Sequence, residues 1–180
     1  MSDRDIINLC HKGEYELAFN HIVQAYSERL YWHVRRLLCS HEDTDDLLQD
    51  IYIKVWSAIP SFRGDSQLYT WLYRIATNEA INKLHKIRRE NAVSMEAVGE
   101  IMASRIDEDP RFCGNAIQRE LHKAIQQLPE KQKLVFNMRY FDDMKYEDIA
   151  VITGTSVGAL KASYHLAYIK IKERLENIDF

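Results

Sequence analysis

The sequence predicts an all-α protein built from two small helical domains, which are joined by a flexible acidic linker. Apolar residues recur at three- and four-residue spacing through most of the chain, which is the periodicity of amphipathic helices. A stretch near the C-terminus has the spacing of a helix-turn-helix motif. Residues 91–115 are acidic and lack helical periodicity, as linkers often do. We therefore expect an N-terminal domain at residues 1–90 and a C-terminal domain at residues 116–180.

The helix-turn-helix is expected between Tyr146 and Leu160. Ala150 is small enough to let two helices cross closely, and Gly154 tolerates the positive φ that the turn requires. Leu160 would pack into the joint from the second helix. The Ser156 hydroxyl would cap that helix by accepting hydrogen bonds from its first amide groups. An ordinary helical hairpin is the alternative interpretation.

Length and composition indicate a globular protein that does not cross a membrane. The chain has 180 residues, of which 46% are hydrophobic, and contains no apolar run long enough to span a bilayer. Its first residues are charged and do not resemble a secretory signal. Cys10, Cys39 and Cys113 are widely spaced, which fits a reducing compartment without disulfides or a zinc site. We therefore expect a cytoplasmic protein without a metal or another cofactor.

Charge is distributed unevenly along the N-terminal domain. The formal net charge is -3, which argues mildly against nucleic-acid binding by the chain as a whole. Residues 42–50 contain five acids and no base, whereas residues 74–90 contain five bases and two acids. The acidic segment would repel DNA, and the basic segment would attract it.

Residues 3–38 are expected to form two core helices that separate near Gly13, and residues 40–59 a third helix capped by Asp43 or Thr44. The apolar side of the third helix holds Leu47, Leu48, Ile51, Tyr52, Val55 and Trp56. Its other side holds a strip at three- and four-residue spacing, which consists of Asp46, Gln49, Asp50 and Ile53. Acids around one exposed isoleucine suggest a protein-docking surface, and a solvated face is the alternative. Clustered carboxylates also occur in metal-dependent hydrolases, but no histidine or glycine-rich phosphate loop accompanies them here, which disfavours that interpretation.

A loop rich in aromatic residues precedes the basic segment. Pro60 is expected to end the third helix, and a fourth helix would run to about Arg89. The aromatic residues are Phe62, Tyr69, Trp71 and Tyr73. Aromatic rings provide stacking platforms and bases provide phosphate contacts, as the binding of single-stranded nucleic acid requires. We interpret Trp71 as a core residue, and residues 62–70 with the basic face as a nucleic-acid-binding surface. The alternative is that the bases are merely solvated.

Four stretches of the chain carry a resemblance to a known family. They are DDLLQDIYIKVW, SFRGDSQLYTWLYRIATNEAINKL, LPEKQKLVFNMRYFDDMKYEDIA and TSVGALKASYHLA. Together they span most of residues 15–90 and 116–176, and the second is far more specific than the helix-turn-helix alone. Their order resembles a bacterial sigma factor of the sigma-70 family, of the extracytoplasmic-function type. The resemblance implies binding to core RNA polymerase and promoter DNA, strand opening and transcription initiation, without catalysis by this chain.

The resemblance also implies residue roles. The strip of Asp46, Gln49, Asp50 and Ile53 matches the surface that docks on the clamp helices of the largest polymerase subunit. Capture of a flipped base and of the strand at the minus-ten promoter element is implied for Phe62, Arg63, Tyr69, Arg74, Asn78, Lys83, Arg88 and Arg89. Reading of the duplex minus-thirty-five element in the major groove is implied for Ser156, Gly158, Lys161, Ser163 and His165.

The chain departs from the family pattern in its last long helix. Many relatives carry arginines where this chain has Ser163 and Leu166, so readout is expected to depend more on Ser156, Lys161, His165 and DNA shape. The resemblance further implies an anti-sigma factor as a partner. A stand-alone helix-turn-helix regulator that binds duplex DNA without polymerase is the alternative function, and a helical adaptor without a nucleic-acid role is a third.

Overall fold

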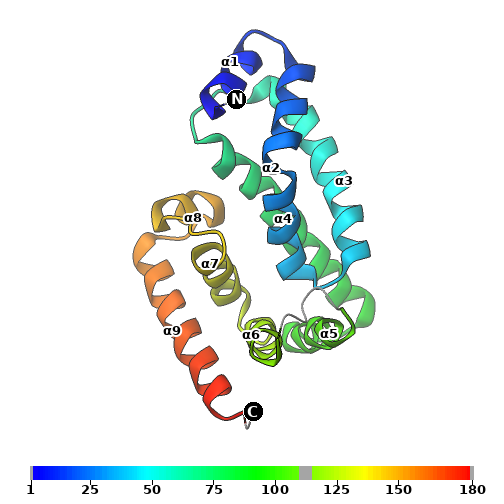
Figure 1. Cartoon of the computed structure of the whole chain (residues 1–180), viewed down its shortest axis with the longest axis vertical. Helices are drawn as coiled ribbons and strands as arrows, with labels where there is room; N and C mark the ends of the chain where they lie inside the picture. The colour runs from blue at the N-terminus through cyan, green and yellow to red at the C-terminus, as the bar shows by residue number, and fades with distance from the viewer. Residues whose placement is uncertain (1, 110–114, 179–180) are drawn as a thin grey trace.

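The computed structural model describes residues 2–109 and 115–178, which form helices joined by short turns. The first group is α1 (Asp3–His11), α2 (Tyr15–Leu38), α3 (His41–Ala58), the 3-10 helix η1 (Ile59–Ser61) and α4 (Leu68–Asn91). After α5 (Met95–Glu108), the second group is α6 (Ala116–Gln126), α7 (Glu130–Tyr140), α8 (Tyr146–Thr153) and α9 (Val157–Glu176). The predicted all-α class is confirmed. Figure 1 shows α2, α3 and α4 packed along one another, with α5 and α6 at the end where the two groups meet.

Helix α3 begins one turn earlier than its predicted cap. The Ser40 Oγ accepts a hydrogen bond from the Asp43 amide at 3.2 Å, so Ser40 is the cap. The prediction of Asp43 or Thr44 as the cap is wrong, and the Thr44 hydroxyl instead donates to the Ser40 carbonyl at 2.7 Å. The early acids of the helix still lie near the positive end of its dipole.

Most of the predicted flexible linker is helix α5, so this part of the prediction is wrong. Ser94 caps the helix, and its Oγ accepts a hydrogen bond from the Ala97 amide at 3.2 Å. Val98, Met102 and Ile106 recur every fourth residue and are all buried. These three side chains attach α5 to the rest of the molecule. The predicted linker residues at 110–114, including Cys113, lie outside the described residues.

Helices α8 and α9 form the predicted helix-turn-helix. Gly154 has a φ of 65°, and its amide donates to the Ala150 carbonyl at 2.9 Å. The Ser156 Oγ accepts a hydrogen bond from the Ala159 amide at 3.3 Å and caps α9. Leu160 is buried. Each of these local predictions is confirmed, because each rests on a requirement of the turn itself.

One apolar core extends through both groups of helices. Ile22 of α2 and Leu72 of α4 belong to the same buried cluster as Val135 of α7, Ile149 of α8 and Leu160 of α9. A smaller cluster lies between α6, α7 and α9. The helix-turn-helix therefore packs directly against the N-terminal helices. Among the described residues, no helix is both long enough and apolar enough to cross a bilayer.

Candidate nucleic-acid and partner interface

The residues predicted for protein docking share one exposed face of α3. Asp46, Gln49 and Asp50 are exposed, and Ile53 is 63% exposed. Exposure of these four residues is what a docking surface requires, and singly exposed apolar side chains also occur on ordinary solvated faces. The carboxylates around Ile53 make the surface anionic.

Trp56 extends this face, although helical periodicity predicted it on the buried side. It lies one turn beyond Ile53, is 46% exposed, and packs edge-on against Phe19 of α2 at a centroid distance of 5.4 Å. Its three-residue spacing from Ile53 was a usable signal for this placement. The apolar part of the face is therefore wider than the sequence suggested.

The aromatic loop is only partly available to a ligand. Phe62 is buried, and its ring packs against Trp71 at a centroid distance of 4.7 Å. Trp71 is buried as predicted, whereas Arg63 is exposed. Phe62 would therefore have to leave its pocket before a base could stack on it. Tyr69 is half-buried, and its hydroxyl donates a hydrogen bond to the Asp148 carboxylate of α8.

The basic residues of α4 divide into exposed and paired groups. Arg74, Arg88 and Arg89 are exposed. Lys83 instead lies 3.0 Å from an Asp43 carboxylate oxygen, and Asp43 also accepts a hydrogen bond from Arg105 of α5 at 2.8 Å. Burial alone would raise the pKa of Asp43. The hydrogen bonds and charges of Lys83 and Arg105 outweigh it and hold the pKa below its ordinary value.

A buried polar cluster joins α2 to the turn between α7 and α8. The Arg36 guanidinium donates to the Asp142 carboxylate and lies 4.9 Å from the centroid of the Phe141 ring. His33 Nδ1 is 3.4 Å from the same carboxylate, and its Nε2 is 2.8 Å from the Thr77 hydroxyl of α4. Burial would raise the pKa of Asp142, but His33 and Arg36 lower it below its ordinary value. No local feature of the sequence indicates this cluster, because Arg36 and Asp142 are 106 positions apart.

The residues predicted for the minus-thirty-five element lie at the N-cap and in the first half of α9. Ser156, Gly158, Lys161 and His165 are exposed. Ser163 is half-buried and lines a cavity together with Asn78 of α4. Residues predicted to read two different promoter elements therefore meet at one cavity in this structure.

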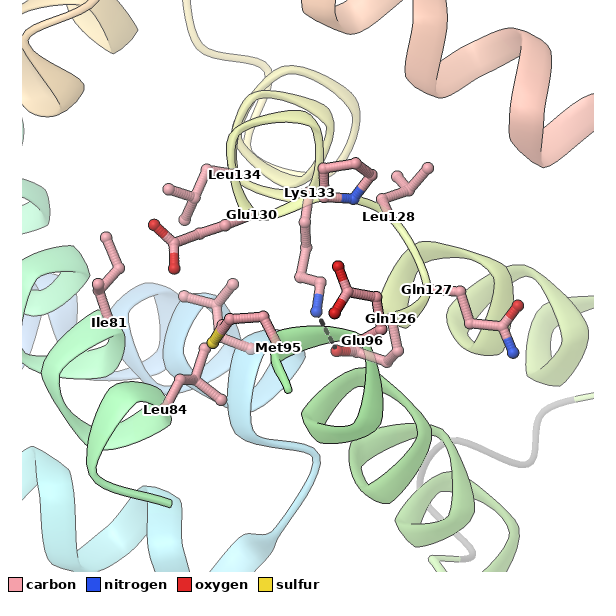
Figure 2. Close-up of a pocket in the computed structure, with 12 residues that line it drawn as sticks. Ile81, Leu84, Met95, Glu96, Gln126, Gln127, Leu128, Glu130, Lys133 and Leu134 are labelled. Carbon is pink, nitrogen blue, oxygen red and sulfur yellow. Dashed lines mark hydrogen bonds between the residues drawn. The ribbon is translucent and has the colours of Figure 1, made fainter. Parts of the chain in front are cut away.

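A second cavity lies where α4, α5, α6 and α7 meet. Figure 2 shows Lys133 reaching from α7 toward Gln126 of α6, with its Nζ donating to the Gln126 side-chain oxygen at 3.1 Å. Gln126 in turn donates to the Arg36 carbonyl at 2.7 Å. Burial lowers the pKa of Lys133. Within the described part of the chain, no three metal-ligating side chains gather at one point.

The sequence matches known families and relatives over most of its length. Residues 22–90 match the family described as Sigma-70 region 2, and residues 118–171 match Sigma-70, region 4. The chain is 30% identical to the RNA polymerase sigma-H factor of Pseudomonas aeruginosa, over 97% of this chain and 94% of that protein. It is also 30% identical to the ECF RNA polymerase sigma-E factor of Escherichia coli, over 98% and 95% of the two chains. The chain therefore belongs to the sigma-70 family, in its extracytoplasmic-function (ECF) branch.

Solved structures share the fold. The sigma factor RpoE of Bartonella quintana, in complex with the anti-sigma factor NepR, has a TM-score of 0.69 at 22% identity, covering 89% of this chain and 98% of that one. The structure of CnrH in complex with the cytosolic domain of CnrY has a TM-score of 0.73 at 21% identity, covering 98% and 99%. At these identities the similarity concerns the fold.

Proposed function

We propose that this chain is an ECF-type sigma factor that binds core RNA polymerase and directs it to promoters, where it helps to open the strands. The exposed face of α3 carries the proposal, since a stand-alone helix-turn-helix regulator has no use for an anionic docking surface in its other half. The match of residues 22–90 to Sigma-70 region 2 favours the same function. In this proposal the chain positions the polymerase and therefore needs no catalytic group of its own. We place this activity in the cytoplasm.

We assign polymerase docking to the strip of Asp46, Gln49, Asp50 and Ile53. Exposure of all four residues on one helical face supports this role. Trp56 would add apolar contact area beside Ile53. Carboxylates on such a surface fit a partner with basic groups, because complementary charge speeds association and fixes register.

We assign capture of the minus-ten strand to the aromatic loop and to α4. Extruding a base costs roughly a few kcal/mol, and stacking on an aromatic platform returns about 1–3 kcal/mol per base. Because these terms nearly cancel, the polymerase must contribute the remaining affinity. Arg63, Arg74, Arg88 and Arg89 are exposed and suited to phosphate contacts. Asn78 is exposed and suited to a base edge.

We assign the minus-thirty-five element to the N-terminal half of α9. Lys161 and His165 are exposed on this helix, and both side chains can donate hydrogen bonds to DNA. Gly158 has no side chain, which leaves room for a close approach of the duplex. Ser156 already accepts the Ala159 amide, so its hydroxyl can still donate to DNA. An anti-sigma factor is a further proposed partner, since the sigma factor RpoE, whose fold this chain shares, was solved in complex with the anti-sigma factor NepR.

The test compares core polymerase binding by the Asp50→Arg variant and a matched control. Asp50→Arg reverses a charge at the centre of the strip and should weaken binding by roughly tenfold or more. Glu28→Arg makes the same charge change at an exposed position of α2, outside the strip, and should bind normally. Circular dichroism would verify that both variants are folded. Equal affinities of Asp50→Arg and the wild type would refute the assignment.

A further inference from the structure

Helix α1 lies outside the part of the chain that matches Sigma-70 region 2, which begins at residue 22. Several contacts nevertheless fix its position. Ile6 and Cys10 are buried in the apolar core. The Tyr26 hydroxyl of α2 donates a hydrogen bond to the Asp3 carboxylate at 2.6 Å. Figure 1 shows α1 beside the segment that leads from η1 into α4. The helix can therefore act as a firm support for that segment.

The entry loop of α4, residues 63–67, has little support of its own. None of its backbone amides donates a hydrogen bond to a backbone carbonyl within the described chain. Phe62 and Leu68 anchor its two ends and are buried, whereas the residues between them are exposed except for the half-buried Ser66. Gly64 has a φ of 77°, in the left-handed region that favours glycine. The shape of the loop therefore depends on what packs against Gly64.

Two side chains of α1 occupy the space next to Gly64. A Cβ atom built on Gly64 would lie 3.5 Å from Cγ2 of Ile7, and 3.9 Å from both Cε1 and Nε2 of His11. Ile7 and His11 are four positions apart and share one side of α1. That side is about 100° around the helix from buried Ile6 and Cys10. The packing that glycine cannot provide with a side chain of its own is thus provided by α1.

We propose that α1 stabilises the entry loop in the shape that captures the minus-ten strand, with His11 as a positioning residue. The proposal rests on the proposed function, which assigns base capture to this loop and to α4. Contact with α1 orders the loop before the strand arrives, so strand binding does not bear the entropy of ordering it. Fixing the backbone of one residue is worth a factor of roughly five or more in an equilibrium constant. Because His11 is exposed, its replacement should affect the loop and leave the apolar core intact.

Trypsin digestion of the full chain without polymerase measures the support of the loop. Cleavage after the exposed Arg63 requires the loop to open locally, and His11→Ala should make it about fivefold faster. His11→Phe keeps a ring beside Gly64 and should be cleaved at the wild-type rate. Asn20→Ala is the matched control at an exposed position of α2 and should also behave as the wild type. Cleavage after Lys145, immediately before α8, should be the same in every variant.

Permanganate footprinting of open complexes measures the consequence for strand capture, at a promoter mapped by transcription of genomic fragments with core polymerase. His11→Ala should slow strand opening about fivefold, while its binding to core polymerase stays unchanged. His11→Phe should open the strands at the wild-type rate. This rescue separates a positioning role from a hydrogen bond between the imidazole and DNA, which phenylalanine cannot make.

Three results would overturn the proposal. The first is an unchanged rate of cleavage after Arg63 in His11→Ala. The second is equally faster cleavage after Lys145, which would mean that the whole chain is destabilised. The third is a His11→Phe variant with normal cleavage and slow strand opening, because His11 would then act on the DNA directly. Failure of the proposed function would instead show as a wild-type chain that does not bind core polymerase, whatever the cleavage rates.

Discussion

Replacement of Gly99 by alanine tests how closely α5 packs against the end of α6. Gly99 is buried, and a Cβ atom built there would lie 2.5 Å from the Gln126 carbonyl oxygen and 3.5 Å from its carbon. Both atoms belong to the backbone and cannot rotate away. Alanine at position 99 therefore requires α5 and α6 to move apart.

The expected magnitude follows from two opposing terms. Overpacking a tight contact costs roughly 1–3 kcal/mol, and this contact is close enough to place Gly99→Ala in the upper part of that range. Replacing glycine by alanine inside a helix gains up to about 1 kcal/mol. The net loss in the free energy of unfolding should therefore be about 1–2 kcal/mol. Displacement of Gln126 would also disturb its hydrogen bonds to Lys133 and Arg36.

Urea unfolding followed by circular dichroism measures this difference. Gly158→Ala is the matched control, because Gly158 also lies in a helix but has no atom within 4 Å of the position that an added Cβ would occupy. It should gain up to about 1 kcal/mol from helix propensity alone. Opposite signs for the two substitutions would support the close α5–α6 contact. A Gly99→Ala variant as stable as the wild type would refute it.

Two further predictions concern pH dependence and promoter opening. Burial and the charge of Arg36 lower the pKa of His122 from 6.5 to about 4. The unfolded chain therefore takes up this proton at higher pH than the folded chain, and stability should fall by about 2 kcal/mol between pH 7 and pH 5. Urea unfolding at both pH values should show this loss, and His122→Asn should remove most of it; an unchanged slope would contradict the assignment. Separately, Asn78→Ala should slow open-complex formation, measured by permanganate footprinting, and leave core polymerase binding unchanged. Normal strand opening by that variant would exclude the base-reading role of Asn78.

Local signals in the sequence were sufficient for much of the fold. The turn at Gly154 and the cap at Ser156 were predicted because each depends on residues within a few positions. The exposed strip around Ile53 was predicted because helical periodicity alone places it opposite the apolar side. On α3 the periodicity misplaced Trp56, which lies at the border of the two sides and contacts Phe19 while remaining 46% exposed.

The errors arose where distant contacts decide the structure. Helix α5 was missed because its acids and Gly99 weaken the helical pattern, whereas burial of Val98 and Met102 depends on other helices. The contact between Tyr69 of α4 and Asp148 of α8 was also missed, since the two residues are 79 positions apart. Neither residue has a local feature that indicates its partner. The two groups of helices were predicted from local pattern, but the apolar core that they share could not be, because its contacts join residues far apart in the chain.

Lys83 illustrates how the fold limits which cations a nucleic acid can use. Its ammonium group already lies 3.0 Å from Asp43, so a phosphate that binds there must replace a carboxylate. The net gain is the difference between two ion pairs in similar surroundings, each worth at most about 1 kcal/mol near the surface. Asp43 would then lose the Lys83 contact and keep the one with Arg105, which attaches α5 to α3. Arg88 and Arg89 are exposed, and a phosphate that binds them does not have to displace the Asp43 carboxylate. Strand binding should therefore depend more on these two arginines than on Lys83.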